Sequence, residues 1–185
     1  MPELVVPTAA VHRSFLDAMR EFADEGRGAE DDDTMFGADL RALGDRWREP
    51  DVFASYVEQL LAEADAGAPR PAGRVACTTL WWVEGDTFLG RIAIRHRLTD
   101  RLREVGGHIG YDVRRSARRR GHATQMLRRA LPIAARLGIE RALVTCSADN
   151  VASRRVIESN GGVLEDCRDD KLRFWVPTSP CPDSG

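Results

Sequence analysis

The first third of the chain has hydrophobic positions spaced as in amphipathic helices. Between residues 11 and 25 the apolar side chains fall three to four positions apart, and residues 51–66 repeat this pattern directly after Pro50. Proline favours the first turn of a helix, so the two segments predict two helices. Residues 26–38 between them contain three glycines and an acidic run, which predicts a loop, and a short helical piece is expected over 39–47.

From about residue 74 the hydrophobic period changes to that of strands. Residues 74–83 and 87–96 are rich in β-branched and aromatic side chains, and three turn-like residues separate them, so we expect a hairpin. The other strands are expected over 4–6, 108–113, 140–146, 163–167 and 172–176, with one helical turn over 98–104.

Two more helices are expected among the later strands. Apolar residues repeat with a 3.6-residue period from Ala123 to Leu137, and a shorter helix over 150–159 is capped by Asp149 or Asn150. The resulting order is strand, two helices, three strands, helix, strand, helix and two strands. We therefore predict an α/β fold of the α+β type, in which about four helices flank a mixed, mostly antiparallel sheet of six to seven strands.

The strand-helix-strand unit over 108–146 is expected to form a parallel crossover within this sheet. A chain of 185 residues suits one domain with a sizeable core. We expect that domain over 1–178, followed by a disordered tail over 179–185.

The composition excludes several classes of partner. The 27 basic and 29 acidic side chains nearly cancel to a formal net charge of -2, so no general positive field attracts nucleic acid. The apolar runs are far shorter than the roughly 18–20 residues of a membrane span, and the N-terminus has no signal-peptide pattern. The four cysteines form no CxxC pair, so neither a zinc site nor a redox motif is expected. These features predict a cytoplasmic protein that binds no nucleic acid, membrane or metal.

The stretch 109–124 carries the strongest chemical signal. A strand-like run to Val113 meets five arginines in seven positions, and Gly121 and Ala123 follow where the helical pattern begins. Free N–H groups and the dipole at a helix start attract anions, and glycine lets a phosphate approach the backbone. Since the basic cluster is local, a small anionic ligand is favoured over a long polyanion. The arginines are Arg114, Arg115, Arg118, Arg119 and Arg120.

This element order, with Arg118-x-x-Gly121-x-Ala123 opening the central helix, resembles the GNAT superfamily of acyl-CoA-dependent N-acetyltransferases. The phosphate signature of that family is Gln/Arg-x-x-Gly-x-Gly/Ala. Residues 150–162, NVASRRVIESNGG, are similar to the asparagine-started helix of the family, which ends in a glycine. The two segments together also look like a bacterial subgroup of predicted acetyltransferases.

The resemblance implies acetyl-CoA as the acyl donor, without a metal, and direct transfer of the acetyl group to a primary amine of a small molecule, peptide or protein. Many members of the family are dimers, so a homodimer remains open. The backbone of Tyr111, Asp112 and Val113 would pair with the pantetheine arm, and Asn150 and Ser153 would flank its thiol end. A pyrophosphate needs several convergent N–H donors. The contacts expected in the phosphate turn are Arg118, Arg119, Arg120, Gly121, His122, Ala123 and Thr124.

The catalytic side chains depart from the family pattern. Many members carry a tyrosine on the helix after Asn150, but Ile157 stands at that position here and cannot donate a proton. A related branch has serine at the position of Ser153, which makes it a candidate to hydrogen-bond the leaving thiolate. Candidates for the general base are His108 and the carboxylate of Glu104. An unperturbed histidine has a pKa of about 6.5, which suits a base near neutral pH.

Two alternatives compete with this reading. A cofactor-binding sensor or scaffold that keeps the fold without catalysis would explain Ile157 in place of tyrosine. Nucleic-acid binding through the arginine cluster is disfavoured by the net charge and by the lack of interleaved aromatic residues.

The nature of the acceptor stays open at this level. Arg91, Arg95 and Arg97 share one strand face, which is either a solvated surface or a site for an acidic group. The acidic residues 30–33 would instead attract a cationic amine, so the two signals oppose each other. Trp81 and Trp82 must face opposite sides of the sheet, and we expect one to fill the core and the other to line the acceptor cleft.

Overall fold

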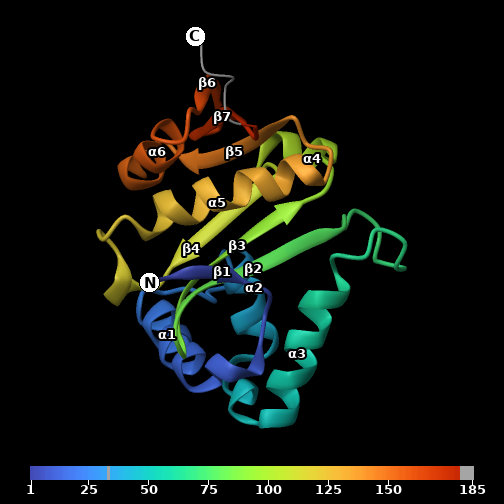
Figure 1. The fold of residues 1–185 in the computed structure, drawn as a ribbon, viewed down its shortest axis with the longest axis vertical. Coiled ribbons are helices and arrows are strands. Elements are labelled where there is room, and N and C mark those ends of the chain that lie inside the picture. The colour runs from blue at the N-terminus through green and yellow to red at the C-terminus, as the bar shows by residue number, and fades with distance from the viewer. Residues whose placement is uncertain (33, 180–185) are drawn as a thin grey trace.

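The computed structural model describes residues 1–32 and 34–179 and places them in one seven-stranded sheet with helices on both faces (Figure 1). The strand order is β1-β2-β3-β4-β5-β7-β6, and every neighbouring pair is antiparallel except β4 and β5. The predicted mixed, mostly antiparallel sheet is therefore confirmed. The strands are β1 (Glu3–Val5), β2 (Cys77–Glu84), β3 (Thr87–Arg95), β4 (Ile109–Val113), β5 (Arg141–Ser147), β6 (Val163–Arg168) and β7 (Lys171–Pro177).

The described residues form six α-helices, two more than expected. One addition is α4, predicted only as a helical turn. The other is α2, which begins at Met35, inside the segment predicted as a loop. There the Thr34 hydroxyl accepts a hydrogen bond from Gly37 N–H, and Phe36 is fully buried, so one cap and one anchor hold a helix too short to show a period. The helices are α1 (His12–Asp24), α2 (Met35–Ala42), α3 (Pro50–Ala62), α4 (Asp100–Glu104), α5 (His122–Arg136) and α6 (Val151–Glu158), with 3-10 turns at Ala9–Val11, Gly44–Arg48 and Arg115–Ala117.

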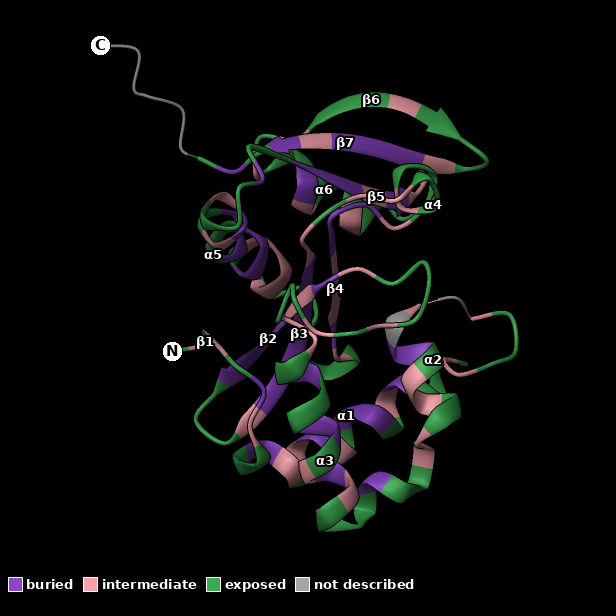
Figure 2. Ribbon diagram, turned by 90° about the vertical axis from the view of Figure 1, so that its right-hand side faces the viewer, coloured by how far each residue is buried: buried purple, intermediate pink, exposed green. Residues whose placement is uncertain are grey.

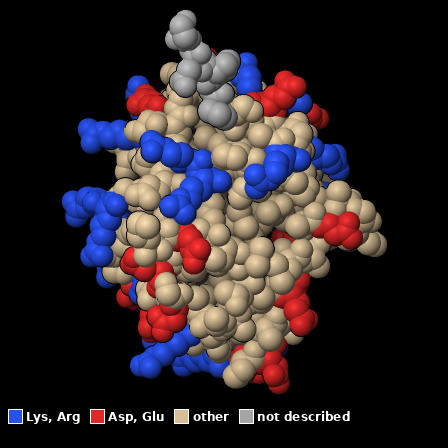
Figure 3. Space-filling view, in the orientation of Figure 1, with Lys and Arg blue, Asp and Glu red and all other residues tan. Residues whose placement is uncertain are grey.

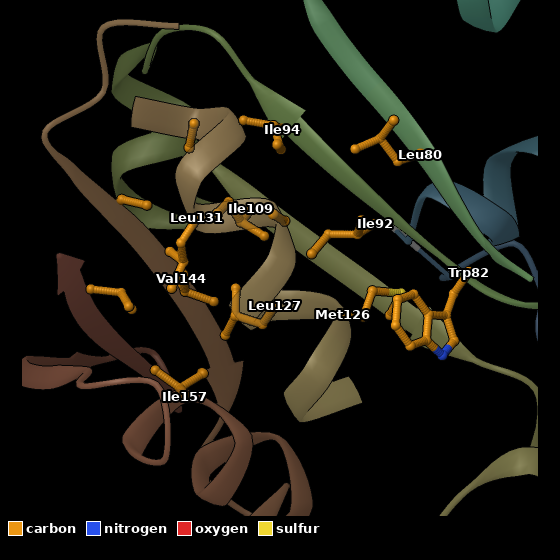
Figure 4. Close-up of a cluster of buried hydrophobic side chains, with 14 of the residues drawn as sticks. Leu80, Trp82, Ile92, Ile94, Ile109, Met126, Leu127, Leu131, Val144 and Ile157 are labelled. Carbon is orange, nitrogen blue, oxygen red and sulfur yellow. The ribbon is translucent and has the colours of Figure 1, made fainter. Parts of the chain in front are cut away.

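One hydrophobic core lies between the sheet and the helices α5 and α6. It is mainly aliphatic, and Figure 4 shows Leu127 and Leu131 of α5 facing Ile109 and Val144 of the two parallel strands. The apolar stripe of α5 explains this layer, because side chains three and four positions apart share one face of a helix. The helix pair is thereby fixed directly above the β4–β5 junction.

A second core lies on the opposite face, under α1, α2 and α3, and is mainly aromatic. Phe15 stacks on Trp81 with ring centroids 5.4 Å apart, while the adjacent Trp82 belongs to the aliphatic core. Both indoles are fully buried, so the prediction that one tryptophan lines an acceptor cleft is wrong. Figure 2 shows buried residues on the sheet and on the inner sides of these helices.

The arginine face of β3 is also covered rather than solvated. Arg91 is 2% exposed, lies 3.7 Å over the ring of Phe36, and donates to Asp39 (2.8 Å) and to the Tyr56 hydroxyl (3.1 Å). Arg95 donates to two backbone carbonyls, and Arg97 alone of the three is exposed. Helices α1 to α3 cover this face because their aromatic side chains need it to bury their own surface.

The expected tail lies outside the described residues from position 180 onward. Within the described ranges, no helix is both long and apolar enough to cross a membrane.

Candidate functional site

The parallel strands β4 and β5 separate soon after they meet. Ile109 pairs with Val144, and His108 N–H donates to the Leu143 carbonyl over 2.7 Å. Across the described residues, Ile109 and Val144 are the one pair in register between these two strands. We call the resulting opening, between residues 111–113 and 146–147, the wedge.

The backbone N–H and C=O groups of β4 point alternately towards β3 and towards the wedge. Arg114 N–H donates to the Leu89 carbonyl on β3, and Arg95 N–H of β3 donates to the His108 carbonyl. In an antiparallel ladder alternate residues bond to the partner, so Asp112 is committed to β3, whereas the N–H and C=O groups of Tyr111 and Val113 face the wedge. The backbone of Tyr111 and the N–H of Val113 are therefore oriented towards the wedge, whereas the Val113 carbonyl accepts a hydrogen bond from Arg118 and the backbone of Asp112 faces β3.

Helix α5 begins at the mouth of the wedge with free N–H groups. Gly121 is its N-cap at φ 78°, and the first helical bond there runs from Gln125 N–H to the Gly121 carbonyl over 3.1 Å. Among the described residues, the N–H groups of 119–124 have no hydrogen-bond partner. A Cβ built on Gly121 would meet no protein atom within 4 Å, so this backbone faces open space. The predicted phosphate turn thus has the donors, the dipole and the access that an anion requires.

The five arginines of this turn have different environments. Arg115, Arg119 and Arg120 are exposed. Arg114 instead pairs with Glu21 of α1 (2.5 Å), and Arg118 pairs with both oxygens of Glu25 (2.6 and 2.7 Å).

These ion pairs fasten the turn to α1. Partial burial raises the pKa of the Glu21 carboxyl, but hydrogen bonds from Arg114 and Ser116 outweigh burial and hold that pKa below its usual range. Arg118 also donates to the Val113 carbonyl over 2.9 Å, so its guanidinium fixes the end of β4. Basic side chains gather over α5 in Figure 3, where the exposed ones include Arg128, Arg129 and Arg136.

His122, Ala123 and Thr124 form the first turn of α5, and their N–H groups point outward as predicted. The His122 side chain, however, packs inward, and its Nδ1 accepts a hydrogen bond from the Trp82 indole over 3.2 Å. Burial lowers the pKa of His122, so the ring is neutral at neutral pH. Its side chain positions the helix start, which leaves the backbone for the ligand.

On the opposite side of the wedge, α6 begins with the predicted cap. The Asn150 side chain accepts a hydrogen bond from Ser153 N–H over 3.0 Å. The Ser153 hydroxyl lies 2.8 Å from the Tyr111 hydroxyl, and the phenol also approaches the Ser153 carbonyl at 3.3 Å. Burial raises the pKa of the Tyr111 phenol well above its ordinary value. Burial also raises the pKa of the Cys146 thiol, and the nearby Ser153 hydroxyl partly opposes that rise.

Ile157 lies one turn further along α6 and is fully buried in the aliphatic core (Figure 4). A Cβ built on Gly162 would lie 2.4 Å from its side chain, which shows how closely the following turn packs on it. At the position where many family members carry a tyrosine, α6 therefore has a buried isoleucine that cannot donate a proton.

The structure does not bring the two predicted bases to the wedge. His108 lies at the closed end of the parallel pair, and its Nδ1 accepts a hydrogen bond from Leu143 N–H over 2.9 Å. Burial, together with the nearby Arg103 and Arg95, lowers its pKa to about 4. Glu104 is exposed on α4, at the end of β5 away from α6 (Figure 1), and pairs with Arg168 at 2.9 Å. Neither position supports the base that we predicted there.

Sequence reasoning missed a contact on the opposite face of β4. Asp112 accepts a hydrogen bond from Arg27, 85 residues earlier, over 2.8 Å. Arg27 lies between Gly26 and Gly28, which adopt φ of 80° and 90°. Paired glycines around an arginine were the available signal, because such a turn can aim one long side chain back at the sheet. The pair attaches the segment between α1 and α2 to the strand that borders the wedge.

A hollow of about 380 Å³ lies where β5 runs into α6. Carboxylates of Asp149, Asp169 and Asp170 line it, and Lys171 donates to Ser147 over 2.7 Å at its floor. Across the described ranges, no group of three or more His, Cys, Asp or Glu side chains is placed to hold a metal ion.

Comparisons with known proteins agree with this geometry. A protein-family model described as an acetyltransferase (GNAT) domain matches residues 29–163. No curated protein sequence matches the chain.

Among solved structures, Mycobacterium smegmatis RimJ in complex with CoA-disulfide is 19% identical, with a TM-score of 0.68, over 98% of this chain and 84% of RimJ. RimL, a ribosomal L7/L12 alpha-N-protein acetyltransferase in complex with coenzyme A, is 14% identical, with a TM-score of 0.64, over 97% and 96% of the two chains. The microcin C7 self immunity acetyltransferase MccE, in complex with acetyl-CoA and AMP, is 12% identical, with a TM-score of 0.63, over 95% and 92%. At these identities the likeness concerns the fold.

Proposed function

The chain belongs to the GNAT acetyltransferase family, and from that premise we propose that it acetylates the N-terminal α-amine of a protein or peptide. The family makes the chain an acyltransferase and makes acetyl-CoA its donor. The acceptor class is our own inference, and a small-molecule amine is the competing acceptor.

The observation that carries the proposed donor site is the set of backbone groups at the start of α5 and on Tyr111 and Val113 that face the wedge. Free N–H groups at the start of α5 suit a pyrophosphate, and the outward edge of Tyr111 and Val113 suits the amide groups of a pantetheine arm. The bare Cα of Gly121 leaves space for the ligand. Such an arrangement would set the thioester between Val113 and Ser153.

The chemistry requires little of the side chains. A neutral amine attacks the thioester carbonyl, the N–C bond forms, the C–S bond breaks, and the proton of the amine passes to solvent. The Val113 N–H, which the β3–β4 register turns towards the wedge, can stabilise the developing oxyanion. Ser153 can hydrogen-bond the departing sulfur.

Two observations support an amine of a peptide. Carboxylates around the hollow at the start of α6 favour the approach of a cationic amine, which must lose its proton before attack. Structures that share the fold include the L7/L12 alpha-N-protein acetyltransferase and a ribosomal-protein-S5-alanine acetyltransferase from Vibrio fischeri.

The test is a panel of acceptors in which thiol release from acetyl-CoA and the mass of each product are followed. We expect peptides with a free N-terminus to be acetylated, and the same peptides with a blocked N-terminus to be inert. Acetylation of lysine side chains or polyamines alone would overturn the proposed acceptor. Thermal stabilisation by CoA without turnover on any amine would favour the sensor alternative, and no stabilisation by CoA would overturn the donor site.

A further inference from the structure

The tyrosine hydroxyls of this chain are confined to two places. Of its two tyrosines, Tyr56 is buried in the aromatic core, where its hydroxyl donates to Asp39 and accepts from Arg91. Tyr111 is the other, and its hydroxyl reaches from β4 across the wedge to α6. No phenol other than Tyr111 is therefore available to the sulfur end of the site.

We propose that Tyr111 is a positioning residue for the leaving thiolate, and that it acts by orienting the hydroxyl of Ser153. The proposal rests on the donor site described above and adds a role for a side chain whose backbone alone was expected to matter. It also accounts for Ile157 at the position where many family members carry a tyrosine. The phenol of Tyr111, from β4, instead contacts Ser153, which lies one turn before Ile157 on α6.

The first argument is geometric. Tyr111 and Ser153 are 42 residues apart and belong to the two elements that diverge at the wedge, yet their hydroxyl oxygens lie 2.8 Å apart. The ring of Tyr111 packs against the aliphatic core, and Ser153 N–H is fixed by Asn150. Packing thus fixes the Tyr111 ring and the cap fixes Ser153, so the two hydroxyls have a defined position on the α6 side of the wedge.

The second argument concerns the direction of the hydrogen bond. A buried phenol stays protonated, since burial raises the pKa of Tyr111, and its O–H is a better donor than that of an aliphatic hydroxyl. The phenol lies nearer to Ser153 Oγ (2.8 Å) than to the Ser153 carbonyl (3.3 Å), which favours donation to the hydroxyl. The single hydrogen of Ser153 can then be donated to a sulfur in the wedge.

The third argument is the charge that develops at the sulfur. As the C–S bond breaks, its electron pair goes to sulfur, and the Ser153 O–H stabilises that charge as a hydrogen-bond donor. The thiolate is protonated from water afterwards, so neither hydroxyl is consumed. Tyr111 strengthens the Ser153 donor because consecutive hydrogen bonds polarise one another.

The experiment measures the thiol pKa of bound CoA by its thiolate absorbance, as a difference spectrum against the protein without CoA. This readout needs no acceptor, so it stands even where no amine is acetylated. In the wild type we expect a thiol pKa below that of free CoA, and in Tyr111→Phe we expect it to rise by roughly one unit. An equal thiol pKa in the two proteins would overturn the proposal.

Turnover gives a second readout once an acceptor is known. Tyr111→Phe and Ser153→Ala should each lower kcat by roughly 10-fold with KM for acetyl-CoA unchanged, and the double variant should lose no more than the worse single one. Ser153→Thr keeps a hydroxyl and should retain most of kcat. Independent, multiplying losses would show that the two residues do not act as a unit.

Tyr56→Phe is the matched control, because it removes the same atom from the other core. It should lower thermal stability while leaving both the thiol pKa and kcat unchanged. If Tyr111→Phe behaved like Tyr56→Phe, with lower stability but an unchanged thiol pKa, the Tyr111 contact would be only a structural link.

Discussion

The two faces of the sheet bury side chains of different chemistry. Under α5 and α6 the core is aliphatic, and its polar groups lie at the edge, where Tyr111 meets Ser153. Under α1, α2 and α3 the core is aromatic and encloses a guanidinium, Arg91, with Asp39 and Tyr56 as its partners. The aliphatic face leaves backbone groups free for a ligand, whereas on the aromatic face Arg91 joins β3 to Asp39 of α2 and Tyr56 of α3.

This difference indicates a division of labour between the faces. The proposed donor site needs exposed N–H groups and would rely on the start of α5, whose N–H groups have no partner among the described residues. The opposite face holds the segment between α1 and α2 against β4 through Arg27 and Asp112. Substitutions on the two faces should therefore separate stability from donor binding.

The largest separation is expected from the tryptophan pair. Trp81→Ala should lower the free energy of unfolding by about 4 kcal/mol, because it empties the centre of the aromatic core. The protein that remains folded should bind CoA with unchanged affinity. Urea unfolding and CoA titration check the two statements, and Trp82→Phe serves as the comparison. That variant keeps most of its core contacts but loses the donor to His122, so it should weaken CoA binding.

A smaller loss of stability is expected at the buried guanidinium. Arg91→Met should lower the free energy of unfolding by roughly 2–3 kcal/mol, since it leaves Tyr56 and the partly exposed Asp39 without their cation. The exposed Arg97→Met is the control and should change stability by less than about 0.5 kcal/mol. A stabilised Arg91→Met protein in urea would mean that the aromatic core tolerates the charge only at a net cost.

The two ends of α5 offer a matched test of donor binding. Gly121 and Gly138 both adopt positive φ, at 78° and 83°, and a Cβ on either would meet no protein atom within 4 Å. Alanine should strain both turns alike, by about 1 kcal/mol. Only Gly121→Ala should weaken CoA binding, by roughly 10-fold, because its Cβ enters the phosphate site. Equal affinities by calorimetry would remove this turn from the site.

A pH dependence of stability is expected at the closed end of the wedge. Burial lowers the pKa of His108 to about 4 in the folded protein. Below roughly pH 6.5, therefore, His108 is protonated in the unfolded chain but stays neutral in the folded one. The contribution of His108 to the free energy of unfolding is therefore complete above that pH. It is lost as the pH falls towards about 4, by at most 1.4 kcal/mol (roughly) per pH unit. In His108→Asn, whose side-chain oxygen can accept from Leu143 N–H, urea unfolding should show a shallower decline over this range.

The phosphate turn could be predicted because its information is local. The arginine run, Gly121 and the start of α5 lie within a few residues of one another, and a helix start exposes its N–H groups whatever surrounds it. The start of helix α2 was missed for the opposite reason, since a helical piece was expected only from residue 39. Eight residues hold too few turns for a period, and the helix depends on burying Phe36 under distant elements.

The candidate base shows the same limit. The residue type and the strand of His108 were correctly identified, but the side chain bonds to β5 at the end away from the opening, and that orientation depends on where two strands pair. In the same way Asp112 was assigned to the ligand, although strand register commits its backbone to β3 and its carboxylate to Arg27.

The sequence by itself determined most of the order of the elements, the sheet type, the family resemblance and the place where α5 begins with free N–H groups, because hydrophobic period and backbone geometry act over a few residues. Only the tertiary structure decided which distant side chains meet. Tyr111 contacts Ser153, which is 42 residues away in the sequence, and Glu21 accepts a hydrogen bond from Arg114, which is 93 residues away. Such pairs depend on strand register and helix packing, which arise from the whole core at once and leave no periodic signal in the chain.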